Sequence, residues 1–301
     1  MKKYAYVVCS TVDGHFAEMA AISAASLQRT NPGARIIVVT DRETLATGTP
    51  GLAAMRSLGA TILVSDAVQP SIIERSRYIK VKLRSLLDGD YVYLDSDTLI
   101  LKDISAVWNM DAEIAGAEDL DPNGRPYLMS EDHRHAYEAI GWEALTQNHV
   151  NTGVLLIRDT APVRTMMDQF YRDWLEYRRV TGKVNDQPTF NHTLRASEVR
   201  FRALPSAYNA QLVYDPRIAT GAKVVHVFSG NFDNRNDTIL HGLARSLKRT
   251  GVIDFATIDR HCELGHVWPT IDSFRKAVAT RNYPKAVVFG FRRVLGTLKA
   301  A

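Results

Sequence analysis

Short apolar runs alternate with segments of helical periodicity along most of the chain. The runs are rich in β-branched and aromatic residues and lack alternation of polar and apolar positions, which is typical of strands buried on both faces. Between them, apolar residues recur three or four positions apart, as on one side of a helix. We interpret residues 4–10, 35–40, 61–64, 91–94, 99–101, 113–117, 154–157 and 224–228 as strands, and residues 16–29, 71–87 and 163–179 as helices.

This order of elements predicts an α/β fold in which helices flank a mainly parallel sheet. Ligands of such sheets bind where strands end at their carboxyl edge, so the loops that follow strands are candidate sites. Three such loops carry polar residues, namely 11–15, 95–97 and 226–233. With 301 residues, we expect one large domain over residues 1–272 and a basic helical segment over residues 273–301.

The composition is that of an ordinary globular protein, with 46% hydrophobic and 23% charged residues. It excludes wholesale disorder, collagen-like chains and disulfide scaffolds. The two cysteines, Cys9 and Cys262, form no C-x-x-C pair, which favours a reducing compartment. The apolar run after residues 1–3 is too short for a signal peptide, and no stretch approaches the roughly 18 apolar residues of a membrane span. We therefore expect a cytoplasmic location.

The formal net charge of +4 is unevenly distributed. Residues 273–301 contain seven Lys and Arg and no Asp or Glu, which leaves 30 basic against 33 acidic residues, a net charge of −3, in the remainder. Aromatic and aliphatic residues lie between these cations, so the segment suits an anionic membrane surface, and we predict peripheral association with the inner face of a membrane. The alternative is a helix docked on the body with its basic side in solvent. A slightly acidic body does not favour nucleic acid as a partner.

Asp-x-Asp pairs recur in the chain, and their positions distinguish them. Asp88 and Asp90 flank a glycine and indicate a turn. Asp95 and Asp97 directly follow the apolar run 91–94, so their carboxylates are expected together at the ligand-binding edge of the sheet. Like charges there repel unless a cation neutralises them, and carboxylate oxygens suit Mg²⁺ or Mn²⁺. The alternative is a pair that only caps a turn or a helix.

The segment YLDSDTLILKDI, residues 93–104, resembles the signature of family 8 glycosyltransferases, which include glycogenin and bacterial lipooligosaccharide galactosyltransferases. His226 and several further segments resemble parts of that family in the same order, namely residues 6–13, 80–83, 117–119, 151–157 and 185–187. The resemblance covers about residues 4–235. It implies a GT-A-type, Rossmann-like fold, a UDP-sugar donor, a Mn²⁺ requirement and retention of configuration at the anomeric carbon.

The resemblance also implies roles for individual residues. A divalent cation, Mn²⁺ or Mg²⁺, would be held by Asp95, Asp97 and His226 and would stabilise the UDP leaving group as a Lewis acid. The catalytic candidates beside the anomeric carbon are Asp186 and Gln187. The residues implied in binding the donor are Thr11, Asp13, Lys80, Asp95, Ser96, Asp119 and Asn151.

Each candidate also has an interpretation without a functional role. His226 at the end of a strand is typical of a core histidine, and Lys80 of a solvated helix side. Asn151 would serve as a turn cap, and Asp186 before Pro188 is typical of the first turn of a helix. The other histidines show no metal-ligand spacing and are interpreted as surface or loop residues, among them His133, His135, His261 and His266.

We therefore expect a retaining glycosyltransferase that moves a hexose, galactose or glucose, from a UDP-sugar to a glycan or lipid-linked acceptor. The chain departs from the family pattern after His226: Gly230 comes one position late and the family's Lys-Pro-Trp is missing, with Arg235 a candidate replacement for the lysine. This departure leaves open a degenerate GT-A-fold protein that binds a glycan or a membrane without turnover. A sugar-1-phosphate nucleotidyltransferase is a further alternative, although residues 10–14 contain one glycine rather than a glycine-rich phosphate loop.

Overall fold

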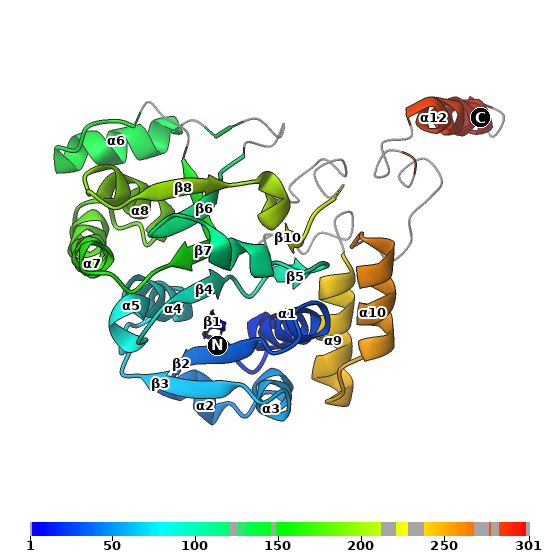
Figure 1. The fold of residues 1–301 in the computed structure, drawn as a ribbon, viewed down its shortest axis with the longest axis horizontal. Helices are drawn as coiled ribbons and strands as arrows, with labels where there is room; N and C mark the ends of the chain where they lie inside the picture. The colour runs from blue at the N-terminus through cyan, green and yellow to red at the C-terminus, as the bar shows by residue number, and fades with distance from the viewer. Residues whose placement is uncertain are drawn as a thin grey trace.

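A sheet of seven strands runs through the computed structural model (Figure 1). The structure describes residues 2–120, 126–127, 129–145, 149–211, 221–227, 238–267, 277 and 283–298. In spatial order the strands are β3 (Thr61–Ser65), β2 (Arg35–Asp41), β1 (Lys3–Val8), β4 (Tyr91–Leu94), β7 (Val150–Ile157), β6 (Ile114–Glu118) and β8 (Phe201–Leu204).

Strand direction confirms the predicted α/β fold with a mainly parallel sheet. Neighbours are parallel at the β3–β2, β2–β1, β1–β4 and β6–β8 contacts, whereas β7 is antiparallel to both β4 and β6. A second sheet of three strands has the order β5 (Thr98–Ile100), β10 (Val224–His226) and β9 (Ala210–Gln211). The two predicted strands at 99–101 and 224–228 thus pair with each other, outside the main sheet.

Helices cover both faces of the main sheet (Figure 1). On one face α1 contacts α3, α9 and α10, and on the other α7 contacts α4, α5, α6 and α8. Two short 3₁₀ helices cover Ser105–Asn109 and Ser206–Tyr208. The α-helices are α1 (Phe16–Thr30), α2 (Arg42–Ala46), α3 (Pro50–Ser57), α4 (Ile72–Val81), α5 (Leu83–Leu86), α6 (Glu131–Ile140), α7 (Ala161–Thr181), α8 (Asp186–Arg195), α9 (Ile239–Thr250), α10 (Phe255–Leu264) and α12 (Tyr283–Leu298).

The absence of alternation in the strands has its expected cause, because both faces of the sheet are buried. In β1, Tyr4, Tyr6 and Val8 belong to the core under α1, and Ala5 and Val7 belong to the core under α7. Small Ala and Ser side chains allow α1 to lie close against the sheet, and every residue from 17 to 27 in it is buried. Cys9 also lies in the second core.

The prediction of one helix over residues 71–87 is wrong. The chain forms α4 and α5 with a break at Lys82. Ile79, Val81 and Leu83, on the two sides of the break, all contribute to the same core.

Other differences follow from weak or overlooked patterns. Helix α6 buries only Ala136 and Tyr137, and β8 is a largely exposed edge strand, so neither has a strong apolar period. Helix α9 does have one, at Leu240, Leu243 and Leu247, and the prediction overlooked it. Helices α2, α3 and α10 and strand β9 were likewise not predicted.

The basic segment contains helix α12, which lies apart from α9 and α10 (Figure 1). The predicted boundary between residues 272 and 273 lies outside the described residues, and the division of the chain there stays a prediction. In the described part of the chain, no helix is both long and apolar enough to span a bilayer.

Candidate functional site

The direction of β7 decides which residues meet at the site. Because β7 is antiparallel to β4, its first residues lie at the edge where β4 ends, and Leu94 pairs with Val154. The residues that follow β4 therefore lie beside those that begin β7, and the Asp95 amide donates to the Gly153 carbonyl over 2.8 Å. The same reasoning applies to β6, which is also antiparallel to β7.

Three side chains converge at this edge from the end of β4 and from β10. His226 Nε2 lies 3.1 Å from Asp97 Oδ1 and 3.8 Å from Asp95 Oδ2. One possible ligand atom from each of the three lies within 4.8 Å of the others. His226 is buried, whereas both carboxylates are partly exposed, so the cluster has an accessible side.

The environment of His226 is strongly anionic. Burial alone would lower the pKa of His226, but the charge of Asp97, its hydrogen bond to the ring and the charge of Asp95 raise the pKa above its ordinary value. The close approach of the ring requires Gly153, since a Cβ there would lie 2.3 Å from His226 Cε1. The glycine of the Asn-x-Gly segment therefore makes room for the histidine.

The donor set fits a divalent cation. Two carboxylates and one imidazole are suitable ligands for Mn²⁺ or Mg²⁺, and a bound cation would replace the proton that the two carboxylates favour on the ring. His226 is buried and both of its ring nitrogens have polar partners, which agrees with a satisfied core histidine as well as with a metal ligand, so its ligand role stays a prediction.

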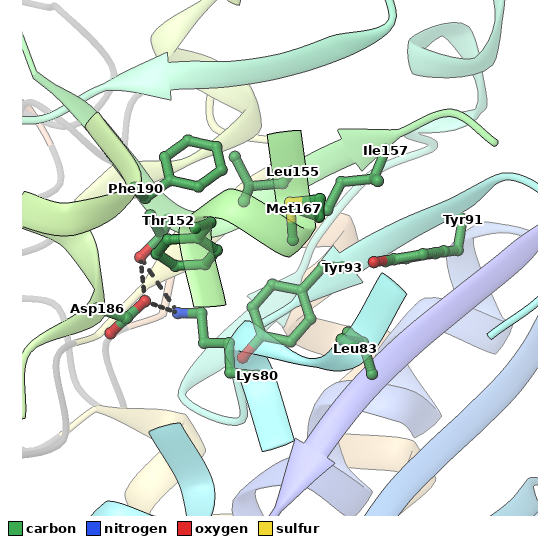
Figure 2. Close-up of a pocket in the computed structure, with 11 residues that line it drawn as sticks. Lys80, Leu83, Tyr91, Tyr93, Thr152, Leu155, Ile157, Met167, Asp186 and Phe190 are labelled. Carbon is green, nitrogen blue, oxygen red and sulfur yellow. Dashed lines mark hydrogen bonds and ion pairs between the residues drawn. The ribbon is translucent and has the colours of Figure 1, made fainter. Parts of the chain in front are cut away.

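Lys80 on α4 lies at the centre of a second group (Figure 2). It is buried, and its Nζ lies 3.2 Å from Asp95 Oδ1, 3.0 Å from Asp186 Oδ2 and 3.2 Å from Thr152 Oγ1. Thr152 Oγ1 in turn donates to Asp186 Oδ2 over 2.9 Å. Lys80 therefore links the acidic pair to α8, and the alternative of a solvated helix side is wrong.

Asp186 is held as an anion. Burial by itself would raise the pKa of this carboxyl group, but the charges of Lys80 and Arg77 outweigh burial and lower the pKa well below its ordinary range. Arg77 Nη1 lies 3.3 Å from Asp186 Oδ1. Asp186 is also the first residue of α8, where the helix dipole favours negative charge, so the helix-start interpretation is confirmed and the site role stays a prediction.

Three further candidates form an amide–carboxylate series. Asn151 Nδ2 donates to Asp119 Oδ1 over 2.9 Å, and Gln187 Nε2 donates to Asp119 Oδ2 over 2.7 Å. Burial raises the pKa of Asp119 despite these two hydrogen bonds. Asn151 lies within β7, so its alternative role as a turn cap is wrong.

A cleft of about 280 Å³ opens beside these groups. Arg77, Asp95, Ser96 and Asp97 contribute polar atoms to its wall, and Phe16 and Ile73 are among its apolar lining residues. Ser96 Oγ donates to the carbonyl of Val7 over 3.2 Å. The small cavity behind Lys80 has a volume of only about 10 Å³ and is lined mainly by apolar side chains (Figure 2). It has room for about one water, so a substrate would occupy the larger cleft.

Thr11 and Asp13 lie in the exposed loop between β1 and α1. The Thr11 hydroxyl accepts from the Gly14 amide over 3.0 Å, and Lys248 on α9 donates to the Gly14 carbonyl over 2.8 Å. The loop is thus braced from α9, and its exposed side chains have no contact with the Asp95–Asp97–His226 cluster among the interactions described.

Comparison with known families decides the assignment. The family model described as "Glycosyl transferase family 8" matches residues 8–241. The chain belongs to glycosyltransferase family 8. No curated protein sequence matches this family 8 glycosyltransferase significantly.

Solved structures support the same fold. The galactosyltransferase LgtC, crystallised with donor and acceptor sugar analogs, is 16% identical and has a TM-score of 0.53, with 92% of this chain and 99% of that chain covered. Mouse xyloside xylosyltransferase 1 is 12% identical with a TM-score of 0.52, covering 76% and 98%. GlyE of Streptococcus pneumoniae TIGR4 is 13% identical with a TM-score of 0.55, covering 89% and 65%. The GT-A-type fold of this family 8 glycosyltransferase is thereby confirmed.

Sequence reasoning missed three residues of the site. Arg77 is three positions before Lys80, and this spacing on one side of α4 was an available signal. Thr152 lies inside the Asn-x-Gly segment but was given no role. Asn209, fully buried beside His226, had no local signal, because it precedes a strand of only two residues.

Two other expectations need comment. His261 is buried on α10, so its interpretation as a surface or loop residue is wrong, and His133 and His135 lie on α6. The segment after His226 that departs from the family pattern, with Gly230 and Arg235, lies outside the described residues beyond Val227.

Proposed function

We propose that this family 8 glycosyltransferase is a retaining enzyme that transfers a hexose, galactose or glucose, from a UDP-sugar to a glycan or lipid-linked acceptor. The observation that carries the proposal is the convergence of Asp95, Asp97 and His226 beside a cleft of about 280 Å³. These three residues would hold a divalent cation, Mn²⁺ or Mg²⁺. When bound, such an ion neutralises charge on a departing diphosphate.

The chain's own charges support the same reaction. Arg77 contributes a partly exposed guanidinium to the cleft, where it can donate two hydrogen bonds to a phosphate. Arg77 is therefore our candidate for the cation that the missing family lysine would supply. Lys80 holds Asp95 and Asp186 in place through an ion pair with each.

Asp186 suits charge stabilisation better than attack. Arg77 engages one carboxylate oxygen, and Lys80 and Thr152 engage the other, so these donors hold the carboxylate in place and lower the nucleophilicity of both oxygens. A fixed anion would instead stabilise an oxocarbenium-like transition state. Asp119 and Asn151 would orient sugar hydroxyls, and Gln187 would lie beside the anomeric carbon.

UDP release from a panel of UDP-sugars tests the proposal, with Mn²⁺ or with a chelator. We expect release from one UDP-hexose, lost with the chelator and reduced at least about 100-fold by Asp97→Asn, the size of effect found when one charge-stabilising group is removed from an active site. Asp103→Asn is the matched control, since Asp103 bonds only the neighbouring Ser105 among the described contacts. Equal release by wild type and Asp97→Asn would contradict the proposed metal ligands.

The degenerate alternative makes the opposite prediction. A protein without turnover would release no UDP from any donor, even with acceptor candidates present. Calorimetry with UDP and Mn²⁺ would then separate the two cases, because an enzyme that needs a particular acceptor still binds UDP, whereas a dead site does not.

We also propose that α12 binds an anionic membrane surface. Tyr283, Val287 and Phe291 recur every four residues on one side of this helix, and with Val288 they are all at least half exposed. Residues 273–301 contain seven Lys and Arg and no Asp or Glu. An exposed apolar side flanked by cations is typical of a helix that lies in a membrane interface.

Vesicle flotation tests this part. The combined variant Val287→Ser, Val288→Ser and Phe291→Ser should bind phosphatidylglycerol vesicles roughly tenfold less than wild type, because it loses apolar burial. Phosphatidylcholine vesicles should bind neither protein well. The control variant Val68→Ser with Val252→Ser removes exposed apolar side chains elsewhere. Equal flotation of all three proteins would refute the membrane role of α12.

A further inference from the structure

A buried chain of three side chains leads from β7 to the imidazole of His226. Asn151 Oδ1 accepts from the Gly153 amide over 2.9 Å and from Asn209 Nδ2 over 2.8 Å. Asn209 Oδ1 lies 3.1 Å from His226 Nδ1. Asn209, Asn151 and His226 are all at most 3% exposed, so water does not compete for these hydrogen bonds.

One backbone amide sets the direction of the hydrogen bonds that join Asn151, Asn209 and His226. The Gly153 N–H can only donate, so the Asn151 atom that faces it is the oxygen. The Asn209 atom that faces the same oxygen must then be its NH₂ group, which turns the Asn209 oxygen toward His226. An amide oxygen can only accept, so His226 Nδ1 must carry a proton.

We propose that Asn209 is a positioning residue that fixes the tautomer of His226. With Nδ1 protonated and bonded to Asn209, Nε2 is directed toward Asp95 and Asp97 as the ligand atom. This inference rests on the proposed role of His226 as a metal ligand, and it adds how the chain prepares that ligand. Partners on the second nitrogen of a ligating histidine commonly fix its ring and tautomer.

The same logic continues on the other side of the site. Asn151 Nδ2 and Gln187 Nε2 both donate to Asp119, and Gln187 Oε1 accepts from the Thr152 amide over 3.4 Å. Two successive backbone amides of β7 therefore orient both ends of the chain, His226 through Gly153 and Gln187 through Thr152. In the hydrogen bonds described, the Asn209 side chain joins Asn151 to His226 and contacts no other candidate residue.

Nitrogen-15 NMR of the His226 ring, in metal-free protein at alkaline pH where the ring carries one proton, tests the proposal. Wild type should show the Nδ1–H tautomer. Asn209→Leu removes the acceptor with little change in size, so the ring should shift to the Nε2–H tautomer, which can donate to Asp97. Binding of Mn²⁺ alone should weaken by roughly 10- to 100-fold. Asn209→Asp retains an acceptor and should keep the Nδ1–H tautomer.

Asn31→Leu is the matched control, because Asn31 is also buried and its Oδ1 accepts from the Ile104 amide away from the site. It should lower the melting temperature without changing the tautomer or Mn²⁺ binding. A wild-type ring protonated at Nε2 would overturn the proposal, even if Asn209→Leu does not fold. So would an unchanged tautomer and unchanged Mn²⁺ binding in a folded Asn209→Leu protein. The NMR result stands whether or not UDP-sugars prove to be substrates, so the two proposals fail separately.

Discussion

Strand β4 carries an Asp-x-Asp pair at each end, and the two pairs have different surroundings. Before the strand, Asp90 Oδ1 accepts from the Asp159 amide over 2.7 Å and Oδ2 from Arg158 over 2.9 Å. These partners directly follow β7 and satisfy both oxygens. The predicted turn at Asp88–Asp90 is thus tied to the residues that follow β7.

At the other end of the strand, Asp95 and Asp97 face His226 and a cleft. Their neighbours come from the start of β7, from α4 and from β10. The two pairs share the same short pattern, yet in the first pair both oxygens of Asp90 are bonded to residues after β7, whereas Asp95 and Asp97 of the second pair line a cleft. The elements that pack around an acidic pair, and not its spacing, decide whether the pair is structural or is available for binding.

The largest effect on stability should come from removing the charge of Lys80, beside Asp95 at the end of β4. Lys80→Met keeps the length of the side chain but leaves Asp95 and Asp186 without their shared partner. Breaking a buried ion pair on one side typically costs about 3 kcal/mol or more, so the free energy of unfolding should fall by about that amount. Urea denaturation measures it.

Lys82→Met is the control for this change. Lys82 lies over the rings of Tyr78 and Tyr171, an interaction worth about 1 kcal/mol or less near the surface. If both variants lost the same stability, the buried contacts of Lys80 would not be the cause.

Acidification should lower the free energy of unfolding through His149, which precedes β7. Its carbonyl accepts a hydrogen bond from the Asp119 amide over 2.7 Å. Burial, with a smaller contribution from His133, lowers the pKa of His149 to about 4. The unfolded chain, with an ordinary pKa near 6.5, then binds the proton more strongly. Stability contributed by neutral His149 is complete above about pH 6.5 and is lost as the pH falls toward 4, by up to about 3 kcal/mol.

Unfolding in urea at a series of pH values checks this prediction. His149→Gln cannot titrate and should flatten the pH dependence between 6.5 and 4, whereas His135→Gln on the exposed side of α6 should not. A pH dependence identical in wild type and His149→Gln would assign the effect to other groups.

The smallest effect on stability is expected at Asp90, before β4. Asp90→Asn weakens an ion pair whose carboxylate is 39% exposed, and such pairs contribute at most about 1 kcal/mol. The amide oxygen can still accept from the Asp159 amide. We expect a slightly lower melting temperature and unchanged UDP release. A loss of turnover comparable to that of Asp97→Asn would remove the distinction between the two ends of β4.

Much of the fold could be predicted because burial leaves a local record. Apolar runs without alternation located β1, β2 and β4, and the position of Asp95 and Asp97 after such a run indicated the site. Where burial is slight, as in α6, the local pattern predicted no element, and over residues 71–87 it predicted one helix where the chain forms α4 and α5.

Local sequence patterns were therefore sufficient to recognise buried strands such as β1, β2 and β4, the acidic pair that follows β4, and the family that the segments resemble. The tertiary structure alone decided that β7 is antiparallel to its neighbours, that Arg77 reaches Asp186, and that Asn209 faces His226. Hydrophobic periodicity records how each segment is buried. Contacts between residues distant in the chain depend on how those segments pack, and that information is not present in any local pattern.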